Sequence, residues 1–192
     1  MPHVPVPADQ PGIRGLLAFK PASGVFVARM IHQLLRGDSP MSAADRERIA
    51  AYVSQVNDCE FCARSHAAAM HHLELAAHSS AVPAQRAEEP SPLLAALLEI
   101  AGAVIRGGHF VTDEKIDAAR AAGADDETIH DTVLIAAAFC MVNRYVDGLG
   151  AITPTDDEAY DAMGVQMAAY GYVGAAPPNS SAATDSSAAT GG

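Results

Sequence analysis

Tryptophan is absent from this sequence, and aromatic residues make up only 5% of its 192 residues. Hydrophobic residues nevertheless reach 49%, and many of them are alanine, which favours closely packed helices over sheets. We see no segment with the alternation of a strand and no glycine-rich nucleotide-binding pattern. A chain of this length can bury one substantial core without disulfides or metals to support it. The sequence therefore predicts an all-α fold with one helical domain.

Basic residues are scarce as well. Lysine and arginine total 12 against 23 aspartates and glutamates, which gives a formal net charge of −11. Without a basic cluster, such a chain is not expected to bind nucleic acid or an anionic membrane surface. The longest apolar run, residues 132–142, is far shorter than the ~20 residues of a membrane span. The N-terminus lacks the pattern of a signal peptide, so we expect a reducing cytoplasmic location.

The third scarce residue is cysteine, with three in the chain: Cys59, Cys62 and Cys140. Three cysteines, two of which are only three residues apart, do not make the disulfide framework that is typical of small secreted proteins. In a reducing compartment a Cys-x-x-Cys pair is more often catalytic or metal-binding than structural. Cys140 lies in the apolar centre of the longest expected helix, where it is interpreted as a small buried hydrophobe.

Prolines, glycines and capping residues divide the chain into three parts: an extended N-terminal segment (1–19), a helical domain (20–172) and a disordered tail (173–192). Residues 78–90 are polar and rich in proline, which predicts a loop. Ser42, Ser91, Asp125 and Thr155 are expected to cap helices. The expected helices cover residues 25–35, 43–56, 60–77, 92–105, 112–122, 126–147 and 156–169.

The most informative stretch runs from Glu47 to His66. If residues from 60 onward are helical, Cys59, Cys62 and His66 fall at i, i+3 and i+7 and share one face. Asp58 is the expected N-cap, which would place both thiols in the first turn, where the helix dipole favours thiolate. Glu47 lies on the preceding helix, and its reach toward the cysteines depends on how the two helices pack.

Three interpretations of the cysteine pair compete. Structural zinc needs four ligands, whereas Cys59, Cys62 and His66 supply three and no second pair follows. His71 or His72 would complete the set only in a bent geometry. Two unreactive buried cysteines are the second interpretation. Redox chemistry is the one we favour, because the spacing permits a disulfide and a base lies one turn from Cys62.

Glu47, Cys59, Cys62 and His66 together resemble the signature of the AhpD-type alkylhydroperoxidases, in the peroxidase-related branch of the carboxymuconolactone decarboxylase superfamily. That signature is a glutamate, eleven residues, Cys-x-x-Cys, three residues and a histidine. The likeness extends in general layout over residues 20–165, and Asn57, Phe61 and the run 143–150 also look like the peroxidase-related variant.

The resemblance implies an all-helical fold that assembles as a homo-oligomer (a dimer, trimer or hexamer) and needs no cofactor. It implies a peroxidase in which Cys62 attacks a hydroperoxide, Cys59 resolves the sulfenic acid to a disulfide, and a dithiol of the lipoyl or thioredoxin-like kind reduces the pair. His66 and Glu47 would relay the proton. From the residues alone, which cysteine attacks stays open.

One position departs from the pattern. The best-known member of the family has a histidine immediately before the second cysteine, where this chain has Phe61. A shorter proton relay results, compatible with slower peroxidase turnover or another substrate. A general disulfide reductase or redox sensor is the main alternative function. A structural zinc protein and a decarboxylase-like enzyme are less favoured, since the decarboxylase branch generally lacks the cysteine pair.

Overall fold

The structure is a computed structural model that describes residues 1–79 and 90–173. The described residues form helices and connecting turns, with no strand among them. The helices are α1 (Ile13–Phe19), α2 (Pro21–Arg36), α3 (Ala43–Val56), α4 (Glu60–Ser79), α5 (Pro92–Arg106), the short 3-10 helix η1 (Gly108–Phe110), α6 (Asp113–Ala121), α7 (Asp126–Gly148) and α8 (Asp157–Tyr170). The predicted all-α fold is confirmed.

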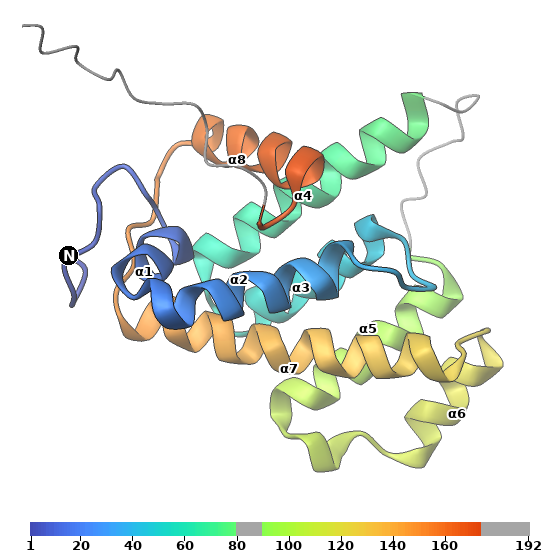
Figure 1. The fold of residues 1–192 in the computed structure, drawn as a ribbon. Coiled ribbons are helices and arrows are strands. Elements are labelled where there is room, and N and C mark those ends of the chain that lie inside the picture. Colours follow the sequence, from blue (N-terminus) through green and yellow to red (C-terminus); the bar gives the residue numbers. More distant parts are fainter. Residues whose placement is uncertain (80–89, 174–192) are drawn as a thin grey trace, which may run out of the picture.

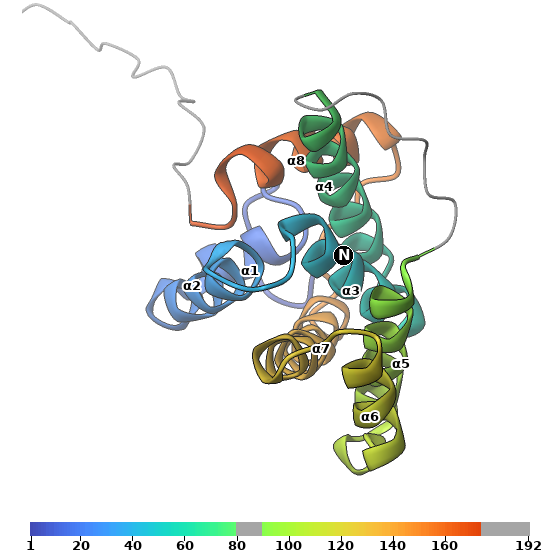
Figure 2. The same cartoon turned by 90° about the vertical axis from the view of Figure 1, so that its right-hand side faces the viewer.

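The helices are arranged around α3, which packs against α2, α4, α5 and α7. In both views α4 and α8 form a pair on one side of the molecule, while α7 and α5 lie on the other (Figure 1, Figure 2). The buried core is aliphatic: Leu35, Ile49, Val53, Ile100 and Ile135 are each fully buried. This arrangement brings the C-terminal helix α8 against α4, the helix that starts beside the cysteine pair.

Several helix starts follow from the predicted caps. The side chains of Ser42, Ser91 and Asp125 each accept a hydrogen bond from the backbone N–H three residues ahead. The cap of α8 was predicted one residue too early. Asp156, not Thr155, accepts the hydrogen bond from the Ala159 N–H at 2.8 Å.

The prediction of an extended segment over residues 1–19 is wrong for its last third. Ile13–Phe19 forms α1, which follows a turn at Gly12 with φ of 61°. Leu16 is only 1% exposed, so burial of this side chain in the core stabilises a helix too short to persist alone. Two predicted segments, most of the 78–90 loop and nearly all of the 173–192 tail, lie outside the described residues.

Asp58 does not cap α4; it ends α3. Its φ of 58° is left-handed, a conformation that aspartate tolerates better than most residues. The Cys59 N–H donates to the Ser54 carbonyl and the Asp58 N–H to the Gln55 carbonyl, the paired bonds of a Schellman motif. The Cys59 carbonyl then accepts the first bond of α4, from Ala63. Cys59 therefore occupies the N-cap position of α4, and Cys62 lies in its first turn.

The longest expected helix is α7, which contacts α1, α2, α3 and α5. Ile135, Phe139 and Val142 face the core, whereas Leu134 and Met141 are 40% and 46% exposed. Not every apolar residue of this helix is therefore buried within the chain. Across residues 1–79 and 90–173, no helix combines the length and hydropathy that crossing a membrane would require.

Candidate active site

Glu47 and His66 meet in the interior between α3 and α4. The Nδ1 atom of His66 lies 2.6 Å from Oε2 of Glu47, and the residues are 6% and 0% exposed. A carboxylate only accepts, so Nδ1 carries the proton that it donates to Glu47. Nε2, which has no protein partner in the described part of the chain, is then left as a hydrogen-bond acceptor. The edge of the Phe139 ring against the imidazole, with centroids 4.6 Å apart, further fixes the ring.

Two residues that the sequence analysis did not identify hold the other oxygen of Glu47. A guanidinium nitrogen of Arg36 lies 2.6 Å from Oε1, and the hydroxyl of Tyr172 donates to the same oxygen at 2.5 Å. The Tyr172 hydroxyl also lies 3.2 Å from Nδ1 of His66. Tyr172 comes from the segment after α8, where its N–H donates to His32 at 3.1 Å. The carboxylate is therefore held from α2, α4 and the C-terminal segment together.

This arrangement keeps Glu47 ionised. Burial alone would raise the pKa of the carboxyl group. The charge and hydrogen bond of His66, the charge of Arg36 and the hydrogen bond of Tyr172 outweigh burial, and the pKa lies below its ordinary value. Burial, followed by the negative charge of Glu47, raises the pKa of Tyr172 well above its ordinary value. The tyrosine therefore stays a neutral hydrogen-bond donor at physiological pH.

The two thiols are free and buried, with Cys59 and Cys62 exposed by 0% and 2%. The hydrogen bond that Cys59 makes to Cys62, then burial and the nearby Cys62 charge, raise the pKa of the Cys59 thiol. Cys59 therefore remains protonated and can donate its hydrogen to the Cys62 sulfur.

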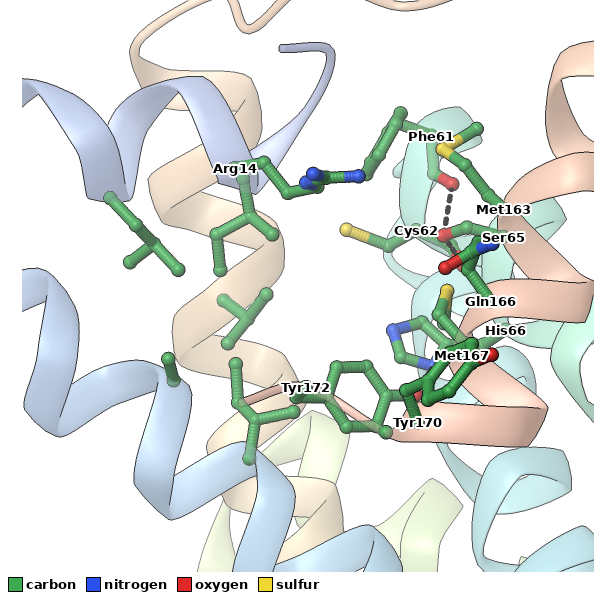
Figure 3. Close-up of a pocket in the computed structure, with 16 residues that line it drawn as sticks. Arg14, Phe61, Cys62, Ser65, His66, Met163, Gln166, Met167, Tyr170 and Tyr172 are labelled. Carbon is green, nitrogen blue, oxygen red and sulfur yellow. Dashed lines mark hydrogen bonds between the residues drawn. The ribbon is translucent and has the colours of Figure 1, made fainter. Parts of the chain in front are cut away.

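A cavity of about 160 Å³ opens next to Cys62. Cys62, Ser65 and His66 line it from α4, together with residues of α1, α2, α7, α8 and the segment after α8. Figure 3 shows the Cys62 sulfur and the His66 ring directed toward the same space. Neither Cys59 nor Glu47 is among the lining residues. The four predicted residues therefore form two layers. Cys62 and His66 line the cavity, and Cys59 and Glu47 lie behind them, away from it.

The other residues singled out in the sequence have structural surroundings. Asn57 donates to Asn143 at 3.0 Å, and Asn143 donates to Ser54 at 2.9 Å, which ties the turn before Cys59 to α7. Cys140 borders this network as an acceptor for Asn57 at 3.6 Å and is half-buried. The Arg144 guanidinium donates to the Cys140 carbonyl at 2.7 Å, a bond within α7.

Comparisons with known proteins show which family and which solved structures this chain is similar to. Residues 21–89 match the family model described as the carboxymuconolactone decarboxylase family, a range that contains all four predicted site residues. The structure resembles one from Ralstonia eutropha JMP134, described as an alkylhydroperoxidase AhpD core and an uncharacterized peroxidase-related protein. Identity is 29%, the TM-score is 0.67, and 80% of each chain is covered. Over residues 21–89 the chain is thus similar to the carboxymuconolactone decarboxylase family, and its fold is similar to that of an AhpD core.

A second solved structure shares the fold. It is an uncharacterized peroxidase-related protein from Silicibacter sp. TM1040, with 22% identity, a TM-score of 0.62, and coverage of 77% of this chain and 76% of that one. A search of curated proteins gave no match. The family model and the 29% identical structure that this chain is similar to are thus described as a decarboxylase family and as an alkylhydroperoxidase core.

Proposed function

We propose that this protein is a thiol-dependent peroxidase that reduces alkyl hydroperoxides through a Cys59–Cys62 thiol/disulfide cycle. The observation that carries the proposal is the order of the four groups: Cys62 and His66 line the cavity, and Cys59 and Glu47 lie behind them. A nucleophile at the cavity with a resolving thiol beside it is the arrangement that such a cycle needs.

In the first step, Nε2 of His66 accepts the proton of the Cys62 thiol. The Cys62 thiolate attacks the terminal oxygen of the hydroperoxide, the O–O bond breaks, and the alkoxide takes the proton from His66 and leaves as the alcohol. Cys62 is then a sulfenic acid. Glu47 stays ionised and stabilises the imidazolium while it exists, as a carboxylate does in a nucleophile–histidine–acid triad.

In the second step, the sulfur of Cys59 attacks the sulfenic sulfur of Cys62. A disulfide forms, and the hydroxyl group leaves as water with the Cys59 proton. An external dithiol then reduces the disulfide and is itself oxidised. The sum is one hydroperoxide and one dithiol converted to one alcohol, one water and one disulfide. We expect a lipoyl or thioredoxin-like dithiol as the reductant.

Burial weighs against the main alternative, a general disulfide reductase. A protein disulfide would have to reach thiols that are at most 2% exposed, whereas a small hydroperoxide can enter the cavity. Structural zinc also finds little support, because no group of three His, Cys, Asp or Glu side chains within residues 1–79 and 90–173 is placed to hold a metal ion. We further expect a homo-oligomer, for which Leu134 and Met141 of α7 offer exposed apolar surface.

The test is steady-state reduction of an alkyl hydroperoxide with a dithiol as the electron source. Cys62→Ser is expected to abolish turnover. Cys59→Ser is expected to stop after one oxidation and to accumulate a sulfenic acid on Cys62, which a dimedone adduct reports by mass spectrometry. Full activity in Cys62→Ser, or an adduct on Cys59 in the wild type, would refute this assignment.

A comparison of oxidants separates the alternative. The proposed peroxidase should be oxidised by an alkyl hydroperoxide at least tenfold faster than by a protein disulfide at equal concentration. The reverse order would identify a disulfide reductase.

A further inference from the structure

The cavity next to Cys62 contains one permanent charge. Its lining is mainly apolar, from side chains such as Leu17, Ile31 and Met163. Among the described residues that line it, Arg14 carries the only permanent formal charge, and none is a carboxylate. The charge of the cavity lining is therefore opposite in sign to the net charge of the chain, which is −11.

The Arg14 guanidinium is also without an internal partner. Arg64 and Arg106 are engaged, since Arg64 pairs with Glu60 and Asp157 and Arg106 lies over the Phe110 ring. Within the described part of the chain, Arg14 makes no side-chain hydrogen bond, ion pair or cation–π contact. Its charge is therefore available to a ligand.

The backbone of α1 is held beside the cavity. A Cβ atom at Gly12 would lie 1.9 Å from the Phe61 ring, so the turn before α1 touches the residue between the two cysteines. Leu16, one helical turn from Gly12, is 1% exposed and anchors α1 in the core. Arg14 lies between these two contacts and is exposed to solvent. Figure 3 shows its side chain extending across the cavity on the side of Phe61.

From this geometry we infer that the cavity takes a hydroperoxide whose apolar body ends in a carboxylate. Arg14 binds the carboxylate at the solvent side while the hydroperoxide group reaches Cys62. A volume of about 160 Å³ is close to the roughly 150 Å³ of an apolar protein cavity that holds benzene, so an apolar body of about six carbon atoms fits it. Guanidinium is suited to such a ligand because its fork of N–H donors matches a carboxylate. This inference rests on the proposed peroxidase function.

The experiment compares two hydroperoxides of the same length, 6-hydroperoxyhexanoate and hexyl hydroperoxide. The wild type should prefer the carboxylate, measured as the ratio of the two kcat/KM values, and Arg14→Met should lower this ratio about tenfold. Arg14→Lys should keep part of the preference. The matched control is Arg29→Met, which removes an exposed arginine of α2 that does not line the cavity and should leave the ratio unchanged. An equal ratio in Arg14→Met and the wild type would overturn the inference.

A second readout does not need peroxidase turnover. Hexanoate should slow alkylation of Cys62 by iodoacetamide, followed by peptide mass spectrometry, more than hexanol does. Arg14→Met should remove this difference. If neither hydroperoxide oxidised Cys62 but the protection by hexanoate depended on Arg14, the peroxidase function would fail and the anion site would stand. Equal protection by hexanoate and hexanol in the wild type would refute the anion site directly.

Discussion

Removing the hydroxyl of Tyr172 tests whether the C-terminal segment belongs to the catalytic machinery. Oε1 of Glu47 accepts from both Arg36 and Tyr172, so Tyr172→Phe leaves a fully buried carboxylate with one donor fewer. A hydrogen bond to a buried charged group contributes about 1.5–3 kcal/mol. We therefore expect the free energy of unfolding to fall by about 2 kcal/mol and Tm by about 4–8 °C.

The kinetic effect has a signature that lost stability alone would not give. The Tyr172 hydrogen bond is one of the interactions that lower the pKa of Glu47, so its loss should raise that pKa. The acid limb of the pH–rate profile for Cys62 oxidation should then move to higher pH. We also expect the rate at pH 7 to fall about tenfold, because a less firmly held Glu47 orients His66 less well.

The assay is stopped-flow oxidation of the reduced protein by an alkyl hydroperoxide between about pH 3 and 9, a range that includes the acid limb set by the lowered pKa of Glu47, with urea unfolding in parallel. Tyr145→Phe is the matched control, since its hydroxyl donates to the neutral Leu16 carbonyl at 3.3 Å, outside the site. That variant should lose about 1 kcal/mol or less and keep the wild-type rate and profile. A Tyr172→Phe profile that coincides with the wild type would refute the role given to this hydroxyl.

Three further changes have defined outcomes. Because the pKa of Glu47 is depressed in the folded state, its stabilisation is present above about pH 4.5 and is lost as pH falls through the folded pKa. Glu47→Gln should therefore cost about 3 kcal/mol at pH 7, with the gap to the wild type narrowing below about pH 4 in urea titrations. Gly164→Ala should lower Tm, because the new Cβ would lie 2.7 Å from the Ala68 backbone and would force α8 away from α4. Gly148→Ala is the control: its new Cβ would meet no atom within 4 Å, so Tm should not fall. Cys140→Ser should leave hydroperoxide turnover unchanged, and a loss of turnover would assign this half-buried thiol a redox role.

The sequence was sufficient for the local parts of this structure. Serine and aspartate caps predicted the starts of α3, α5 and α7, because a side chain that bonds a nearby N–H acts within one turn. The Glu47–His66 contact was within reach of sequence reasoning because the two residues lie on consecutive helices joined by a tight turn. Asp58 was misassigned because aspartate suits both an N-cap and a left-handed turn, and tertiary packing decides between them.

The residues missed by the sequence analysis depend on contacts between distant segments. Tyr172 lies 125 residues from Glu47, and no spacing pattern links the two. Arg36 could have been read only as a basic residue in the last turn of α2, where a favourable interaction with the helix dipole is a sufficient explanation. Similarly, α1 is too short to be recognised by periodicity, and burial of Leu16 identifies it only in the folded chain.

The proposed cycle has one direct measurement: the thiol count and disulfide map of the reduced protein after one equivalent of an alkyl hydroperoxide. We predict that two of the three thiols disappear, that a single Cys59–Cys62 disulfide forms, and that a dithiol restores both thiols while Cys140 stays free throughout. Three free thiols after the addition, or a disulfide that includes Cys140, would contradict the function proposed for this site.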